Sequence, residues 1–263
     1  MNVLIIGASG FIGRRLGDQL ARDGKLIGDD DCKIIAKLML ADKVKPELPR
    51  DESDDATQVK RVEVDITDPA SVQTILQDTP AVIFHLAAIV SGDAETNFEL
   101  GYKVNVDGTR VLLDAIKVME GYTPRFVFSS SLAVYGPPMP DIIPDDYATT
   151  PRGSYGTQKA IVELMLEDYT RKGYVDGVSI RFPTIAIRPG KPNKAASSFV
   201  SGMVREPLSG LEAPLPVNMD FRHTVASPQV AVDYLLRAAT FHPEQPGDRT
   251  LQMPGVSLTV KEM

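Results

Sequence analysis

Short apolar runs alternate with longer segments of helical periodicity through the first two-thirds of the chain. Six runs have the length and unbroken hydrophobicity of strands buried on both faces: 3–6, 37–41, 62–64, 81–85, 126–129 and 178–182. The segments between them place apolar residues at helical spacing: 11–22, 70–77, 98–119 and 155–172. Strands that alternate with helices predict an α/β fold in which right-handed crossovers build a Rossmann-type, doubly wound parallel sheet.

Two polar segments interrupt this alternation. Residues 24–32 insert an acidic turn between the first helix and the second strand. Residues 46–57 are rich in Asp and Glu, a composition typical of a solvated loop. We expect both segments to lie at the surface, outside the core.

The pattern changes after the sixth strand, where closely spaced prolines separate short elements, among them helices expected at 195–205 and 228–240. This change predicts a dinucleotide-binding domain at 1–181 and a smaller substrate-binding lobe at 182–263. Such a lobe would close over the carboxyl edge of the sheet, where open α/β sheets bind their ligands. Residues 257–262 have the pattern of a strand end, an N-cap and a first helical turn, so we expect a truncated C-terminal lobe, with a frayed tail as the alternative.

Composition narrows the class of protein. The chain has 263 residues, of which 43% are hydrophobic and 24% charged, as in a soluble globular protein with a sizeable core. A net charge of −7 argues against binding to nucleic acid or to an anionic membrane. The chain begins with a strand rather than a targeting segment, and no apolar run reaches the roughly 18 residues of a spanning helix. We therefore expect a cytoplasmic protein.

Metal and disulfide chemistry are not expected. Cys32 is the only cysteine, so no intrachain disulfide can form. The three histidines, His85, His223 and His242, are far apart in the sequence and lack the spacing of a metal motif. We expect His85 to be a packed structural residue.

A glycine motif directly follows the first strand and opens the first helix. It reads Gly7-x-x-Gly10-x-x-Gly13, with Phe11 and Ile12 in the first helical turn. The first glycine allows a tight turn, the second a close approach of the backbone to pyrophosphate, and the third close packing of helix on strand. The motif therefore predicts a dinucleotide site at the helix N-terminus.

The ends of the next strands supply further candidates for cofactor contacts. Asp42 ends the second strand, where a carboxylate can accept hydrogen bonds from the adenosine ribose and would repel a 2′-phosphate. We therefore expect NAD, although Lys43 and Lys45 leave NADP open. Asp65 and Ile66 follow the third strand and are candidates to flank the adenine, with helix capping as the alternative for Asp65. Three residues after the fourth strand, two of them small, would let the backbone approach the cofactor: Leu86, Ala87 and Ala88.

A tyrosine and a lysine four residues apart suggest what is done with the cofactor. Tyr155 and Lys159 lie on one face of a predicted helix, so an ammonium can sit beside a phenol. We expect Lys159 to lower the pKa of Tyr155 from its usual value of about 10, which would allow proton exchange with an alcohol or carbonyl. Ser131, at the end of the fifth strand, could hold the substrate oxygen.

Taken together, these motifs resemble the extended short-chain dehydrogenases/reductases, the superfamily of nucleotide-sugar epimerases and dehydratases. The strings that carry the resemblance are Gly7-x-x-Gly10-x-x-Gly13, His85-x-Ala-Ala88, Asn105-x-x-Gly108-Thr109, Ser129-Ser-Ser131-x-x-Val-Tyr135-Gly136 and Tyr155-x-x-x-Lys159. Finer strings are similar to one branch, the D-erythronate dehydrogenases, which oxidise the C2 hydroxyl of a four-carbon sugar acid with NAD: 85–92, 129–137 and 183–193.

The resemblance implies a role for each catalytic candidate. Tyr155 would be the general base, Lys159 would hold the nicotinamide ribose and stabilise the tyrosinate, and Ser131 would orient the substrate oxygen. It also places Asn105 and Pro183 beside the cofactor. The superfamily usually carries an Arg-Asp-Phe-x-His string, which reads Met219-Asp-Phe-Arg-His here, and the lost arginine weakens the case for a nucleotide-diphosphate substrate.

A sugar acid needs a cation for its carboxylate, and arginine has the geometry for two parallel hydrogen bonds. The substrate candidates after the strands are Ser91, Ser131, Thr184, Arg188, Asn193 and Arg222, with Lys191, Lys194 and His223 as further options. Three functions remain open: an NAD-dependent dehydrogenase of a small sugar acid, a nucleotide-sugar epimerase or dehydratase with retained NAD, and a non-catalytic dinucleotide-binding protein. By analogy with the superfamily, helices 98–119 and 155–172 could form the face of a homodimer.

Overall fold

The computed structural model of the chain describes residues 1–28, 32–49, 57–192, 194–242 and 249–263. The acidic turn expected at 24–32 and the loop expected at 46–57 lie partly outside these ranges. Asn193, one of the substrate candidates, lies outside them altogether.

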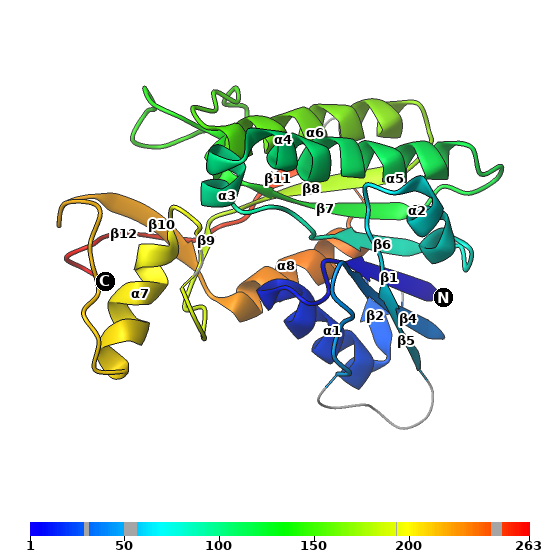
Figure 1. Cartoon of the computed structure of the whole chain (residues 1–263). Helices are drawn as coiled ribbons and strands as arrows, with labels where there is room; N and C mark the ends of the chain where they lie inside the picture. The colour runs from blue at the N-terminus through cyan, green and yellow to red at the C-terminus, as the bar shows by residue number, and fades with distance from the viewer. Residues whose placement is uncertain (29–31, 50–56, 193, 243–248) are drawn as a thin grey trace.

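A seven-stranded parallel sheet forms the centre of the molecule, in the order β11-β8-β7-β6-β1-β4-β5 (Figure 1). Its strands are β1 (Asn2–Ile6), β4 (Lys37–Asp42), β5 (Gln58–Glu63), β6 (Val82–His85), β7 (Arg125–Ser131), β8 (Asp176–Phe182) and β11 (Thr250–Gln252). The strand order reverses direction at β1, next to β6, as in doubly wound folds. The predicted α/β Rossmann-type fold is therefore confirmed.

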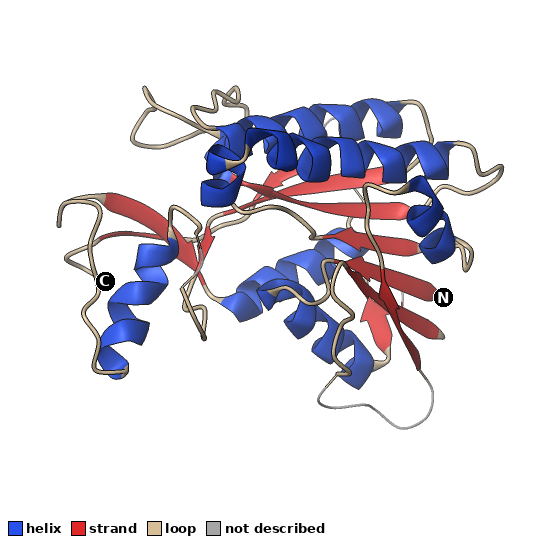
Figure 2. Cartoon of the chain, viewed as in Figure 1, coloured by secondary structure: helices blue, strands red, loops and turns tan. Residues whose placement is uncertain are grey.

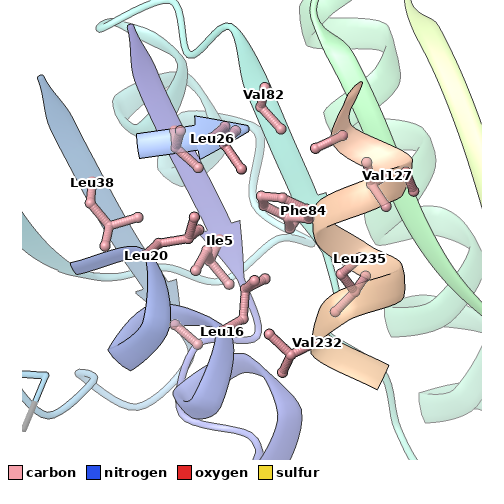
Figure 3. Close-up of a cluster of buried hydrophobic side chains, with 14 of the residues drawn as sticks. Ile5, Leu16, Leu20, Leu26, Leu38, Val82, Phe84, Val127, Val232 and Leu235 are labelled. Carbon is pink, nitrogen blue, oxygen red and sulfur yellow. The ribbon is translucent and has the colours of Figure 1, made fainter. Parts of the chain in front are cut away.

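Helices cover both faces of this sheet (Figure 2). One face carries α1 (Phe11–Asp23) and α8 (Pro228–Thr240), and the other carries α2 (Pro69–Leu76), α5 (Gly108–Lys117) and α6 (Ser154–Arg171). Figure 3 shows the first layer, in which Leu16, Val232 and Leu235 pack against Ile5 and Phe84. All five side chains are at most 1% exposed, so both faces of the sheet strands are buried, which is why these strands read as unbroken apolar runs.

A small second sheet lies beyond the ends of β7 and β8. It contains β9 (Thr184–Ile185), β10 (Arg222–Ala226) and β12 (Val256–Thr259), in the order β12-β10-β9, and α7 (Ser198–Leu208) lies beside it (Figure 1). Residues after 181 thus supply this sheet and also α8 and β11 of the large one. The expected division into 1–181 and 182–263 is a functional one and stays a prediction.

Two local features were not predicted, and one expected feature is present. The insertion after α1 forms an antiparallel hairpin from β2 (Lys25–Ile27) and β3 (Cys32–Ile34). The helix expected at 98–119 is divided into α4 (Phe98–Gly101), a π-helical turn η1 (Tyr102–Asp107) and α5. At 257–262 the expected N-cap is present, since the Thr259 amide and hydroxyl both donate to the Glu262 carboxylate.

Candidate active site

The carboxyl ends of the central strands bring most of the cofactor candidates to one edge of the sheet. The residues that follow β1, β4 and β6 there are Gly7, Lys43 and Leu86. Ser131 ends β7, and its partner in the register is Phe182 at the end of β8, so Pro183 and Thr184 continue from the strand beside it. The smaller lobe borders the same edge (Figure 1).

The first and third glycines of the motif are required by close contacts. Gly7 has a φ of 93°, and a Cβ there would lie 2.5 Å from the backbone nitrogen of Ala87. A Cβ at Gly13 would lie 2.1 Å from the carbonyl oxygen of Gly7. Both positions therefore exclude any side chain, so Gly7 brings the loop against Leu86 and Ala87, while Gly13 packs α1 against the loop.

The N-terminus of α1 is free of protein side-chain caps. Gly10 is its N-cap and offers no side chain, and the first turn, which begins with Phe11 and Ile12, contains no acidic residue. The amides of this turn and the positive end of the helix dipole can therefore serve an anionic ligand. This geometry fits the pyrophosphate of a dinucleotide.

Asp42 is held beside the glycine loop by backbone amides. The amide of Ser9 donates to its Oδ2 at 2.9 Å, and the amide of Lys43 donates to its Oδ1 at 2.7 Å. The loop itself is fixed to the same strand, because the amide of Gly7 donates to the carbonyl of Ala41 at 2.9 Å. A carboxylate fixed next to the pyrophosphate position has the placement that recognition of an adenosine ribose requires.

Asp65 and Ile66 lie at the next strand end. The amide and hydroxyl of Thr67 donate to Asp65, at 2.9 and 2.8 Å, and these bonds hold its pKa below the usual value. The ammonium of Lys43 lies 3.4 Å from the same carboxylate. This ion pair compensates the positive charge of Lys43, one of the two lysines that had left binding of NADP open. Ile66 is buried, and a Cβ on Gly108 would come within 2.9 Å of its side chain. Both residues therefore border the edge. Asp65 orders its own turn, and the capping alternative for it is wrong, because the N-cap of α2 is Asp68.

His85 is a packed structural residue, as expected. It is 1% exposed, and its Nε2 lies 2.9 Å from the hydroxyl of Thr109. Burial, together with the charge of Lys159, lowers its pKa to about 3. The imidazole is therefore neutral across the physiological range.

Tyr155 and Lys159 occupy successive turns of α6 and face the end of β7. The Nζ of Lys159 donates to the carbonyl of Ser129 at 2.6 Å and lies 5.6 Å from the centre of the Tyr155 ring. The hydroxyl of Ser131 accepts the amide of Ala133 at 3.1 Å. The structure thus brings the three expected catalytic residues to the facing ends of two elements, β7 and α6.

The expected lowering of the Tyr155 pKa is wrong for this packing. Burial raises the pKa of Tyr155 to about 12 and lowers that of Lys159 to about 7. Desolvation disfavours the charged form of each group, and a lysine that is half neutral near pH 7 does little to favour a phenolate. The spacing places the pair correctly but does not by itself tune the phenol.

Asn105 fastens the loop after β6. Its Oδ1 accepts the amide of Ile89 at 2.7 Å, and its Nδ2 donates to the carbonyl of Ile89 and to Gln158, which lies between the catalytic tyrosine and lysine on α6. The residue is 3% exposed and lies in the π-helical turn. Its amide is committed to these protein groups, so it supports the edge, and a direct cofactor contact stays a prediction. Pro183, also assigned to the cofactor, is buried directly after β8.

A buried network behind the catalytic serine was missed from the sequence. Glu163 accepts hydrogen bonds from Ser130 and from Arg181, whose Nη2 lies 2.8 Å from Oε2, and Arg181 also donates to the hydroxyl of Tyr135. Glu163 is 5% and Arg181 8% exposed. One sequence signal was present, since Tyr155, Lys159 and Glu163 are each four residues apart.

The candidate substrate-binding residues differ in the partners that their side chains have in the protein. Ser91 accepts the amide of Ala196 at 2.9 Å, which ties α3 (Ser91–Thr96) to the loop before α7. Thr184 contacts His223 at 2.6 Å. Arg222 donates to the carbonyl of Ser257, within the small sheet, and so is engaged there rather than free for a ligand.

A hollow lies between β9 and α7. It is lined by Thr184 and Arg188 on one side and by serines of α7 and its N-cap on the other. The side chains of Ser91, Thr184 and Arg222 thus have partners in the protein. The guanidinium of Arg188 has none in the described part of the chain.

Two further findings concern the described ranges. No group of three or more His, Cys, Asp and Glu residues is placed there to hold a metal ion. None of the helices in those ranges is long and apolar enough to cross a membrane.

The fold and the edge define the class to which the chain belongs. The model of the NAD dependent epimerase/dehydratase family matches residues 3–223, and the chain is a member of this family of NAD-dependent enzymes. It is 45% identical over its whole length to a D-erythronate dehydrogenase from Cupriavidus necator and 43% identical to another from Haemophilus influenzae, and it covers 80% of each.

Solved structures agree with this class. A protein from Agrobacterium tumefaciens, described as a nucleoside-diphosphate-sugar epimerase, is 50% identical and superposes with a TM-score of 0.91 over all of this chain and 76% of the other. A UDP-glucose 4-epimerase from Thermus thermophilus in complex with NAD, 20% identical, has a TM-score of 0.78 over all of this chain and 80% of the other. The second likeness concerns the fold alone.

Proposed function

We propose that the protein oxidises the C2 hydroxyl of D-erythronate to give 2-dehydro-D-erythronate, with NAD as the oxidant. The observation that carries the proposal is the meeting of Ser131, Tyr155 and Lys159 at the strand edge that also holds the glycine loop. Two full-length relatives above 40% identity that bear the name D-erythronate dehydrogenase support the choice of substrate.

The chain's own residues would divide the chemistry among them. Ser131 donates to the substrate oxygen and orients it, and the ionised oxygen of Tyr155 accepts the hydroxyl proton. Lys159 holds the nicotinamide ribose beside the phenol. Bound NAD would supply the hydride acceptor for the hydrogen on C2, so that each turnover would yield one keto acid, one NADH and one proton.

The edge also accounts for cofactor binding. The backbone after Gly7, Gly10 and Gly13 would hold the pyrophosphate, and Asp42 would accept the adenosine ribose hydroxyls. Leu86 and Ala87 lie against the loop and, with Ala88, would form the floor beneath the cofactor.

One observation favours a second candidate, an epimerase or dehydratase of a nucleotide sugar. The Agrobacterium structure, 50% identical, is described as a nucleoside-diphosphate-sugar epimerase. Such an enzyme would use the same tyrosine but would release no net NADH. A non-catalytic dinucleotide-binding role is the weakest of the three, because a binding module has no need for the Ser-Tyr-Lys arrangement. The cytoplasmic location and a homodimer are predictions that accompany either enzyme.

The test is a direct assay of NADH absorbance at 340 nm. Purified protein is mixed with NAD and, separately, with C4 to C6 aldonic acids, uronic acids and UDP-sugars, and sugar products are separated by chromatography. We expect steady NADH formation with D-erythronate above all others. No NADH with any acid, together with interconversion of a UDP-sugar, would replace this proposal with the epimerase.

A further inference from the structure

The hollow beside β9 contains a cationic side chain that has no partner among the described residues. It is formed by β9, the loop that follows it and the start of α7, and the side chains that matter are Thr184, Arg188, Ser197, Ser198, Ser201 and Arg205. Thr184 is two residues beyond Phe182, the register partner of Ser131. The hollow therefore begins next to the strand end that carries the catalytic serine.

The two arginines of the hollow differ in their partners. Arg205 donates to the Glu206 carboxylate at 2.5 Å and to the carbonyl of Arg188 at 2.9 Å, so its charge is compensated. The guanidinium of Arg188 has no hydrogen-bond or ion-pair partner in the described part of the chain. Burial lowers the pKa of His223, which contacts Thr184, so this histidine adds no positive charge. The hollow thus carries one uncompensated positive charge, on Arg188.

The backbone of Arg188 is fixed although its side chain is free. Its amide donates to the hydroxyl of Ser201 at 2.9 Å, and Ser201 is only 4% exposed. With Arg205 bound to the carbonyl, both polar groups of the Arg188 backbone are held by α7. A cation presented from a fixed backbone is preorganised for a ligand and loses little order on binding.

Hydroxyl groups accompany the charge. Ser197 is the N-cap of α7 but makes no capping bond with its side chain, and the hydroxyl of Ser198 likewise has no partner among the described residues. Arginine supplies two parallel donors that match a carboxylate, and serine hydroxyls match neighbouring alcohol groups. This set of groups suits a short polyhydroxy acid.

The loop that carries this site is closed onto the cofactor side of the edge. Lys194 lies 2.8 Å from the Asp93 carboxylate, and its carbonyl packs so closely on Gly92 that a Cβ there would lie 2.0 Å from the oxygen. With the bond from Ala196 to Ser91, these contacts hold the start of α7 against α3.

We infer that Arg188 binds the carboxylate of the sugar acid and that the hydroxyls of Ser197 and Ser198 bind its alcohol groups. The inference rests on the proposed function, since a 2-hydroxy acid has its carboxylate adjacent to the carbon that reacts. In this arrangement, the side chain of Arg188 alone selects an acid over a neutral polyol of the same length.

The experiment compares the wild type with Arg188→Met, Arg188→Lys and, as control, Arg237→Met, which removes an exposed arginine from α8. Kinetics are measured with D-erythronate and with erythritol, its neutral counterpart, and NAD binding is measured by calorimetry. Loss of a charge-assisted pair should lower kcat/KM for D-erythronate by about 10- to 100-fold in Arg188→Met. Arg188→Lys should recover part of the loss. Activity on erythritol, NAD affinity and the control should change less than about twofold.

Two results overturn the inference. One is a wild type that oxidises D-erythronate and an Arg188→Met variant that does so equally well. The other is an equal loss on the acid and on erythritol. Calorimetric binding of D-erythronate to the NAD complex separates this inference from the proposed function. A wild type that binds the acid without turnover, while Arg188→Met binds none, would retain the anchor and refute the reaction. A wild type that binds no aldonate would refute both.

Discussion

At the scale of single residues, the balance of charge around Tyr155 is the central feature. Burial raises its pKa to about 12 and lowers that of Lys159 to about 7, so the pair alone does not supply the free energy needed to form the tyrosinate. Removing the phenol oxygen should therefore remove proton transfer and little else.

Tyr155→Phe is expected to lower kcat by at least about 100-fold, the contribution typical of general acid–base catalysis, while NAD affinity changes little. Stopped-flow or steady-state NADH formation gives kcat, and calorimetry gives the NAD dissociation constant. Tyr169→Phe, on an outer turn of the same helix, is the control, since that hydroxyl donates to Asp114 rather than to the edge. Turnover retained in Tyr155→Phe would contradict the mechanism.

Asp42→Ala should change the choice of cofactor. The carboxylate now accepts the amides of Ser9 and Lys43, and its charge would repel a 2′-phosphate. We expect the ratio of kcat/KM for NAD to that for NADP to fall by about tenfold or more, as one lost ionic contact would produce. The ratio is measured with a fixed substrate, and an unchanged ratio would show that Asp42 does not face the ribose.

The lowered pKa of Lys159 makes stability depend on pH. In the unfolded chain this amine keeps its proton up to about pH 10.5, and in the folded protein it loses it near pH 7. Between these values the unfolded state binds more protons, so this residue makes the free energy of unfolding rise with pH. Above pH 10, Tyr155 acts in the opposite direction, because its folded pKa is the higher one.

The measurement is urea unfolding at pH 7, 8 and 9 for the wild type and Lys159→Met. The difference in unfolding free energy, wild type minus variant, should become more favourable to the wild type as pH rises. A constant difference would mean that the buried lysine keeps its ordinary pKa.

At the scale of elements, the Glu163–Arg181 network joins α6 to β7 and β8. Glu163 accepts a hydrogen bond from the hydroxyl of Ser130. The residue before it, Ser129, accepts one from Lys159 through its carbonyl, and the residue after it, Ser131, lies on the proposed substrate side. The network therefore sets the register between the catalytic helix and the catalytic strand.

Glu163→Gln should destabilise the fold by about 3–5 kcal/mol, because it leaves the buried charge of Arg181 without a partner. It should also lower kcat more than NAD affinity, since the strand end moves relative to Tyr155. Glu167→Gln, exposed one turn further along, is the matched control. The double variant Glu163→Gln/Arg181→Met should regain stability, and failure to regain any would contradict the pairing argument.

Local patterns in the sequence were sufficient for the elements and for the motifs built within one element. Gly7, Gly10 and Gly13 lie in one turn, and Tyr155 and Lys159 on one helix face, so spacing alone placed them. The partner of Glu163 is on a different element, and the bond exists only because β8 packs under α6. The spacing of residues in the sequence does not show how different elements pack.

Contacts between different elements also distinguish the candidate substrate-binding residues from one another. Arg188 and Arg222 look alike in the sequence, but the side chain of Arg222 donates to the carbonyl of Ser257 on the neighbouring strand, whereas the guanidinium of Arg188 has no partner among the described residues. The π-helical turn was also missed, and Asn105 within it accepts the amide of Ile89, sixteen positions earlier. These outcomes depend on contacts between distant segments.

At the scale of the whole molecule, α8 belongs to the core of the large sheet although it follows the smaller lobe. Val232 and Leu235 are at most 1% exposed and pack with Leu16 and Ile5 (Figure 3). The two parts of the chain should therefore unfold together, in one cooperative transition.

Leu235→Ala is expected to lower the free energy of unfolding by about 2–5 kcal/mol, the cost of a cavity in a close-packed core. Leu208→Ala, at an 84% exposed leucine of α7, should change it by less than about 0.5 kcal/mol. Both are measured by urea unfolding, followed by far-ultraviolet circular dichroism and by tyrosine fluorescence. Two separate transitions in the wild type would contradict a single folding unit.

The position of β11 beside β8 has a consequence for the order of events on the ribosome. Residues 250–252 form the outermost strand on that side, so more than nine-tenths of the chain lies between β1 and the strand that completes the sheet's width. While the nascent chain is being extended, β8 has an open edge of unpaired amides and carbonyls, and the apolar face awaiting α8 is bare. Translation must pass through β9, α7 and β10 of the smaller lobe before either is covered, so both stay exposed while these elements are being made.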